Sequence, residues 1–179
     1  MTSYRLFGAE TSPYSLKVRS FLRYKNADFD WVLRSAATEE EFNRHAILPT
    51  VPLLVSPGGK TSQDSTNMLA TLEKNHAAPS AIPEDPACQA IALLLEDYAD
   101  EWLNKAMFHN RWSQSPDREA AATRVIEQLL SGKQPAKRRE AQASVVERMA
   151  EKLPIVGATA ENAPVIAVSY THLTLPTKA

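Results

Sequence analysis

The chain has 179 residues, of which 44% are apolar and 23% charged, with five glycines and a formal net charge of −1 at pH 7. These values are typical of a globular protein of one or two domains, and they exclude collagen, low-complexity disorder and fibrous repeats. The balanced charge gives no indication of a nucleic-acid partner. The single cysteine, Cys88, excludes an internal disulfide and a metal site built on several thiolates.

No stretch approaches the roughly 20 apolar residues that a membrane span requires. Met1 to Gly8 lacks the basic start and long apolar run of a secretion signal. The sequence therefore predicts a cytoplasmic protein with neither a membrane nor a nucleic-acid partner.

The first 77 residues alternate short strands with amphipathic helices. Strands are predicted at 4–8 and 30–34, and helices begin after the good N-cap residues Ser12 and Thr38. A turn of composition Pro-Gly-Gly then separates two short strands, 51–55 and 60–63, as a hairpin, and apolar spacing predicts a third helix from about Ser65. The order βαβαββα predicts a small α/β domain with a mixed four-stranded sheet.

The remainder of the chain has a different pattern. Residues 78–86 contain three prolines and are predicted to be a linker. Residues 87–166 carry apolar stripes at helical spacing, the first formed by Ile91, Leu94, Leu95, Tyr98 and Trp102, and predict an all-α domain. Residues 167–179 are rich in β-branched residues and lose this periodicity, which favours a non-native or disordered tail, with a native extended tail as the alternative.

The first candidate site is the junction between the first strand and the first helix. The first turn of a helix presents free backbone N–H groups and a partial positive charge, which together stabilise an anion. The hydroxyl of Ser12 adds a movable donor that could hold a ligand thiolate and lower the pKa of that thiol. The alternative is that Ser12 only caps the helix.

Two further turns carry residues of the same kind. Val51-Pro52 begins a strand, and a cis bond there would leave the Val51 backbone ready to pair with an extended peptide ligand. Ser65, at the start of the third helix, could receive a carboxylate, while Asp64 could pair with an ammonium group. An α-amino-acid head group carries both charges, although plain capping is again the alternative for Asp64 and Ser65.

In this order, the three motifs resemble the glutathione S-transferase superfamily, from about Tyr4 to Ile166. Ser12-Pro13-Tyr14-Ser15 is similar to the glutaredoxin Cys-Pro-Tyr-Cys segment with serine in both cysteine positions. Val51-Pro52 resembles the cis-proline of the family, and Asp64-Ser65 its acidic-Ser pair. The segment 94–103 is similar to the first helix of the second domain. The resemblance implies a thioredoxin-like N-terminal domain and an incomplete helical C-terminal domain.

The same resemblance implies a function and roles for these residues. Ser12 would activate the glutathione thiol, Val51 with Pro52 would hold the cysteinyl backbone, and Asp64 with Ser65 would bind the γ-glutamyl end. Glutathione would be a co-substrate with no other cofactor and no metal, the second substrate a small electrophile, and the full-length form a homodimer. The thiolate would attack or isomerise the electrophile, which would lie between the domains near four aromatic residues: Tyr98, Trp102, Phe108 and Trp112.

The chain departs from the family pattern in two ways. Thr50 stands where the family often has a basic residue that reaches the glycyl carboxylate, so His45 or Arg44 could take that role. Serine at both positions 12 and 15 argues against a thiol-disulfide mechanism, which needs a protein thiolate. The alternative function is a non-catalytic module that binds glutathione or a protein, and a third possibility is an unrelated two-layer domain.

Overall fold

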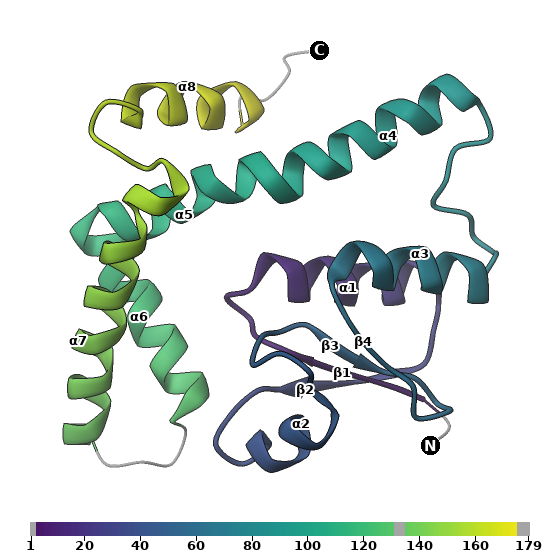
Figure 1. Ribbon diagram of the computed structural model, residues 1–179, viewed down its shortest axis with the longest axis horizontal. Coiled ribbons are helices and arrows are strands. Elements are labelled where there is room, and N and C mark those ends of the chain that lie inside the picture. The colour runs from purple at the N-terminus through teal and green to yellow at the C-terminus, as the bar shows by residue number, and fades with distance from the viewer. Residues whose placement is uncertain (1–2, 131–134, 175–179) are drawn as a thin grey trace. The chain divides into compact units, whose positions relative to one another are not determined.

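The computed structural model describes residues 3–130 and 135–174, which form two compact units (Figure 1). The first unit comprises residues 1–92 with 127–132, and the second comprises 93–126 with 133–179. The first unit contains the sheet, and the described residues of the second form helices joined by turns.

The first unit is built on one mixed sheet of four strands. Its strands are β1 (Tyr4–Gly8), β2 (Phe29–Leu33), β3 (Leu53–Val55) and β4 (Thr61–Gln63). They lie in the order β2-β1-β3-β4, with β1 parallel to β2 and antiparallel to β3, which pairs antiparallel with β4. The predicted fold class, a mixed four-stranded sheet followed by helices, is confirmed.

Three helices cover the two faces of this sheet. Helices α1 (Pro13–Tyr24) and α3 (Ser65–Asn75) lie side by side on one face, and the short α2 (Glu39–His45) lies on the other (Figure 1). Side chains alternate between the faces along each strand, so neighbouring apolar residues enter different cores. Leu6 and Leu54 pack with residues of α1 and α3, whereas Phe7 and Leu53 pack with Phe42 of α2.

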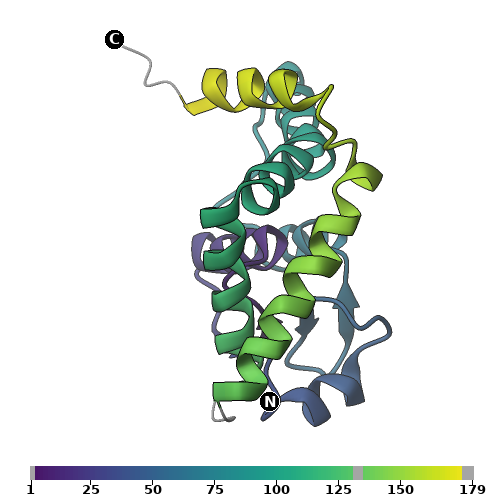
Figure 2. The ribbon, with the colours of Figure 1, turned by 90° about the vertical axis from the view of Figure 1, so that its left-hand side faces the viewer.

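Helices follow one another in the rest of the chain. They are α4 (Pro86–Tyr98), the π-helical η1 (Ala99–Leu103), α5 (Asn104–Ser113), α6 (Ser115–Leu129), α7 (Pro135–Lys152), the 3-10 turn η2 (Pro154–Val156) and α8 (Ala163–Thr174). Figure 2 shows α6 and α7 side by side, and Gln142 of α7 donates a hydrogen bond of 3.0 Å to the Thr123 hydroxyl of α6. None of the helices in the described residues is long and apolar enough to cross a membrane.

Helix α8 differs from the expectation for the C-terminal tail. The sequence predicted that helical periodicity ends near Ala167, but the helix continues to Thr174. Pro164 lies in its first turn, where a proline costs no hydrogen bond. The β-branched residues that follow therefore did not prevent helix formation. Residues 175–179, the rest of the predicted tail, lie outside the described residues.

Candidate functional site

The strand register brings three chain segments to one edge of the sheet. Phe7, next to the end of β1, pairs with Leu53 at the start of β3, and Leu53 pairs with Gln63 at the end of β4. Three segments therefore adjoin the same edge of the sheet: the one that follows β1, the one that precedes β3 and the one that follows β4. They carry, in that order, Ser12, Val51-Pro52 and Asp64-Ser65.

Ser12 is the N-cap of α1. Its backbone is extended, and its hydroxyl oxygen accepts a hydrogen bond of 3.2 Å from the backbone N–H of Ser15. The capping role considered from the sequence is therefore present. It does not compete with thiol activation, because a hydroxyl that accepts through its oxygen still has its own proton to donate.

The loop between β1 and α1 is held by a cluster of three side chains. The Glu10 carboxylate accepts hydrogen bonds from Arg19 at 2.7 Å and from the Trp31 indole at 2.9 Å. The Arg19 guanidinium stacks 4.5 Å from the centre of the Trp31 ring. The hydrogen bond from Arg19 is the largest cause that lowers the pKa of Glu10 below its ordinary value. The cluster thus ties the loop that precedes Ser12 to α1 and β2.

The Val51–Pro52 peptide bond is cis. Pro52 is buried and Val51 is half-buried, and the pairing of β3 with β1 begins one residue after Pro52, at Leu53. The Val51 backbone therefore lies outside the ladder of the sheet.

Asp64 and Ser65 form the start of α3. Asp64 caps the helix, and its Oδ1 accepts from the backbone N–H groups of Thr66 at 3.0 Å and Asn67 at 3.4 Å. Its φ of +92° lies in a region that non-glycine residues rarely occupy, and such conformations cluster at functional sites. Ser65 is buried as the first helical residue, so its backbone N–H belongs to the first turn.

The two residues suggested to bind the glycyl carboxylate, His45 and Arg44, lie together at the C-terminal end of α2. His45 is the last residue of α2 and is half-buried, whereas Arg44 beside it is exposed. Thr50 lies in the exposed loop 46–50, between α2 and Val51. Within the described residues, no cluster of metal-ligating side chains occurs at this edge or elsewhere.

The sequence did not predict a role for Gln63, whose side chain faces the loop 46–50 from β4. Its side-chain amide forms hydrogen bonds with the backbone of residues Ile47, Leu48 and Thr50. A glutamine in a short polar strand gives no signal of such a role, because its partners lie about 15 residues earlier in the chain.

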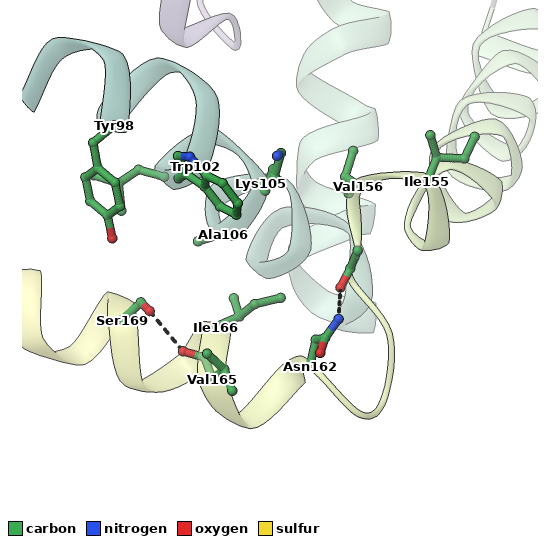
Figure 3. Close-up of a pocket in the computed structure, with 12 residues that line it drawn as sticks. Tyr98, Trp102, Lys105, Ala106, Ile155, Val156, Asn162, Val165, Ile166 and Ser169 are labelled. Atoms are coloured by element: carbon green, nitrogen blue, oxygen red, sulfur yellow. Dashed lines mark hydrogen bonds between the residues drawn. The ribbon is translucent and has the colours of Figure 1, made fainter. Parts of the chain in front are cut away.

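The four aromatic residues expected near a second substrate do not form one group. Phe108 and Trp112 pack together with ring centres 6.3 Å apart, and Trp112 is buried in the helical unit. Tyr98 and Trp102 instead line an open cavity of about 490 Å³ within that unit, opposite Val165 and Ile166 of α8 (Figure 3). The Lys105 ammonium lies 4.3 Å from the centre of the Trp102 ring.

The sheet order, the three covering helices and the helical region that follows define a thioredoxin-like domain joined to a helical one. Residues 6–80 match the family model described as glutathione S-transferase, N-terminal domain. Residues 6–80 thus carry the similarity to that domain family, and the relatives below support the glutathione S-transferase superfamily.

Curated and solved relatives agree with this assignment. Glutathione S-transferase U16 of Arabidopsis thaliana is 28% identical over 131 residues, which cover 70% of this chain and 56% of that protein. A crystal structure of a glutathione S-transferase from Methylobacillus flagellatus KT with glutathione bound is 26% identical, with a TM-score of 0.50, and the match covers 84% of this chain and 68% of that one.

The fold is also similar to that of the Tau class glutathione S-transferase of mango, Mangifera indica, with a TM-score of 0.51 at 20% identity and coverage of 86% of this chain and 60% of that one. The chain spans about half the length of the curated relatives that it matches.

Proposed function

We propose that this chain binds glutathione at the β1–β3–β4 edge and activates its thiol for attack on, or isomerisation of, a small electrophile. The observation that carries the proposal is the register of Phe7, Leu53 and Gln63, which aligns the three candidate segments. A solved relative of 26% identity holds glutathione, which supports the choice of ligand.

Each segment would recognise a different part of the tripeptide. The α1 N-terminus and the Ser12 hydroxyl would stabilise the thiolate, after the thiol has lost its proton to solvent. The Val51 backbone would pair with the extended cysteinyl residue. Asp64 would bind the γ-glutamyl ammonium group, and the first turn of α3 at Ser65 would bind the carboxylate beside it.

In this scheme the protein positions glutathione and stabilises its thiolate. The sulfur lone pair forms a bond to an electrophilic carbon, and the electrons of the broken bond leave with the leaving group or move into the electrophile. His45 is proposed to contact the glycyl carboxylate. The full-length family form is proposed to act as a cytoplasmic homodimer.

The test measures the pKa of the bound glutathione thiol from the ultraviolet absorbance of the thiolate at several pH values. We expect Ser12→Ala to raise this pKa by about one to two units, because a hydrogen bond to a charged group contributes about 1.5–3 kcal/mol. Ser12→Thr keeps both the cap and the hydroxyl and should retain the low pKa. Ser20→Ala, an exposed serine on the same helix, is the matched control.

Turnover with a panel of electrophiles separates the two candidate functions. A transferase loses turnover in Ser12→Ala in proportion to the loss of thiolate. A chain that binds glutathione but shows no Ser12-dependent turnover is a binding module. An unchanged thiol pKa in Ser12→Ala contradicts the proposed role of Ser12.

A further inference from the structure

The amide of Gln63 is fully used by a single loop. Its Oε1 accepts hydrogen bonds from the backbone N–H groups of Ile47 and Leu48, both at 2.8 Å. Its Nε2 donates to the backbone carbonyl oxygens of Leu48 at 2.9 Å and Thr50 at 2.8 Å. A side-chain amide can accept two hydrogen bonds and donate two, so this one is saturated.

The loop has two other anchors: Ala46 at its start packs against the cluster around Phe42, and Arg34 donates a hydrogen bond of 2.6 Å to the Pro49 carbonyl oxygen. Ile47 is 85% exposed and Leu48 is 56% exposed, so neither side chain anchors the loop in a core. Residues 46–50 belong to no helix or strand. Loops without buried side chains open at low free-energy cost unless their backbone groups are held. The Gln63 amide supplies four such contacts from the end of β4.

Gln63 also lies between the two proposed peptide-binding segments. The loop that it holds continues directly into Val51-Pro52, and Asp64 is the next residue after Gln63. We propose that Gln63 is a positioning residue for glutathione: it fixes the Val51 segment relative to Asp64 and so sets the affinity for the tripeptide. This inference rests on the proposed function. It assigns Gln63 no contact with the sulfur and no part in thiol activation.

No other side chain of this size satisfies the same four groups. Glutamate would present a second acceptor to the carbonyl oxygens of Leu48 and Thr50, and methionine would satisfy none of the four groups. Protonation of a glutamate gives back one O–H donor, which could bond to one of those carbonyl groups. In a Gln63→Glu chain, lowering the pH therefore restores one of the hydrogen bonds that hold the loop.

The experiment compares the unsubstituted chain with Gln63→Met, Gln63→Glu and the control Ser62→Ala, which alters the neighbouring position on the opposite face of β4. Affinity is measured by calorimetry with S-methylglutathione, which has no thiol to titrate. Hydrogen exchange of the Ile47 and Leu48 amides reports the state of the loop. The thiol pKa is measured with glutathione itself.

We expect Gln63→Met to expose both amides to exchange and to weaken binding by about tenfold or more, because the ligand must then order the loop. The thiol pKa of bound glutathione and kcat at saturation should be unchanged. In Gln63→Glu, affinity relative to that of the unsubstituted chain at the same pH should increase as the pH falls from neutral, while the relative affinity of Ser62→Ala should stay constant. Groups common to all these chains, such as His45 and Asp64, act equally in each, so the ratio isolates position 63 and remains decisive if Gln63→Met does not fold.

The possible failures are distinguishable. If the unsubstituted chain does not bind the probe, the proposed function is wrong and this inference with it. If it binds, but Gln63→Met binds equally well or Gln63→Glu gains no affinity relative to the unsubstituted chain in acid, the role of Gln63 alone is wrong. A change in thiol pKa without a change in affinity also overturns it.

Discussion

Gly8 ends β1 at a point where no side chain fits. A Cβ atom there would overlap the six-membered ring of Trp31 and lie 3.0 Å from the Cβ of Ser15. The Trp31 indole in turn donates to Glu10 in the loop before Ser12. The missing side chain at Gly8 thus lets the Trp31 ring pack against the strand end and hold the loop that carries the proposed catalytic hydroxyl.

Gly8→Ala should therefore destabilise the protein. Overpacking a well-packed site costs about 1–3 kcal/mol, and we expect a loss of about 2 kcal/mol in the free energy of unfolding, measured by urea denaturation. The matched control is Gly58→Ala in the β3–β4 turn, where an added Cβ meets nothing within 4 Å. Equal stability of the two variants would mean that Trp31 moves aside freely.

At the scale of single residues, the sequence predicted those side chains that form hydrogen bonds with backbone groups nearby in the chain. Ser12 and Asp64 could be assigned as caps because a cap and its helix are adjacent in the chain. Gly8 and Gln63 could not be assigned a role, since their partners Trp31 and residues 47–50 come together only when the sheet forms. Their roles depend on the register, which no local pattern specifies.

A buried ion pair connects α1 and α3 with the segment that follows α3. The Lys25 side chain is fully buried, and its ammonium lies 2.6 Å from the carboxylate of Glu73. Lys25 also donates to the Pro79 carbonyl, and Glu73 accepts from the Ser80 hydroxyl and the Ala81 N–H. The pair therefore fixes residues 79–81 onto the two helices.

Glu73→Gln should lower the free energy of unfolding by about 3 kcal/mol at neutral pH, because it leaves a buried charge without its partner. Burial raises the pKa of Glu73, but hydrogen bonds from Lys25 and Ala81 outweigh it and hold the pKa below its ordinary value. The stabilisation is thus complete above the ordinary glutamate pKa of about 4.3 and is lost as the pH falls through the lowered value.

The difference between the unsubstituted chain and Glu73→Gln should accordingly shrink in acid. Denaturant unfolding at several pH values measures it, with the exposed Glu84→Gln as the control. A difference that is near zero at neutral pH, or that persists in acid, would contradict this account.

Elements were predicted well where local signals agree. The strand 4–8 and the start of the third helix at Ser65 were predicted as the structure has them, because a cap or a closing glycine marks each boundary. Helix α8 was missed, since its β-branched residues carry no periodicity that identifies a helix. Propensity is a weak guide for such a segment.

The apolar stripe of α4 and η1 is left largely uncovered. The sequence predicted a helix with an apolar stripe in this segment, and the helix forms. However, Leu94 is 66% exposed, Leu95 60% and Trp102 61%. Periodicity predicts that a face will be apolar but not what covers it, and the curated relatives are about twice as long as the matched part.

An exposed apolar stripe of this kind drives association of the whole molecule. We expect the chain to self-associate as its concentration rises, in sedimentation velocity, and to enhance the fluorescence of an apolar dye. The double substitution Leu94→Lys with Leu95→Lys should reduce both signals, because charged side chains resist burial against a second copy. Gln89→Lys, on the opposite face of α4 by helical spacing, adds a charge without changing the stripe and should leave both signals in place. If the double variant associates as strongly as the unsubstituted chain, the surface responsible lies elsewhere.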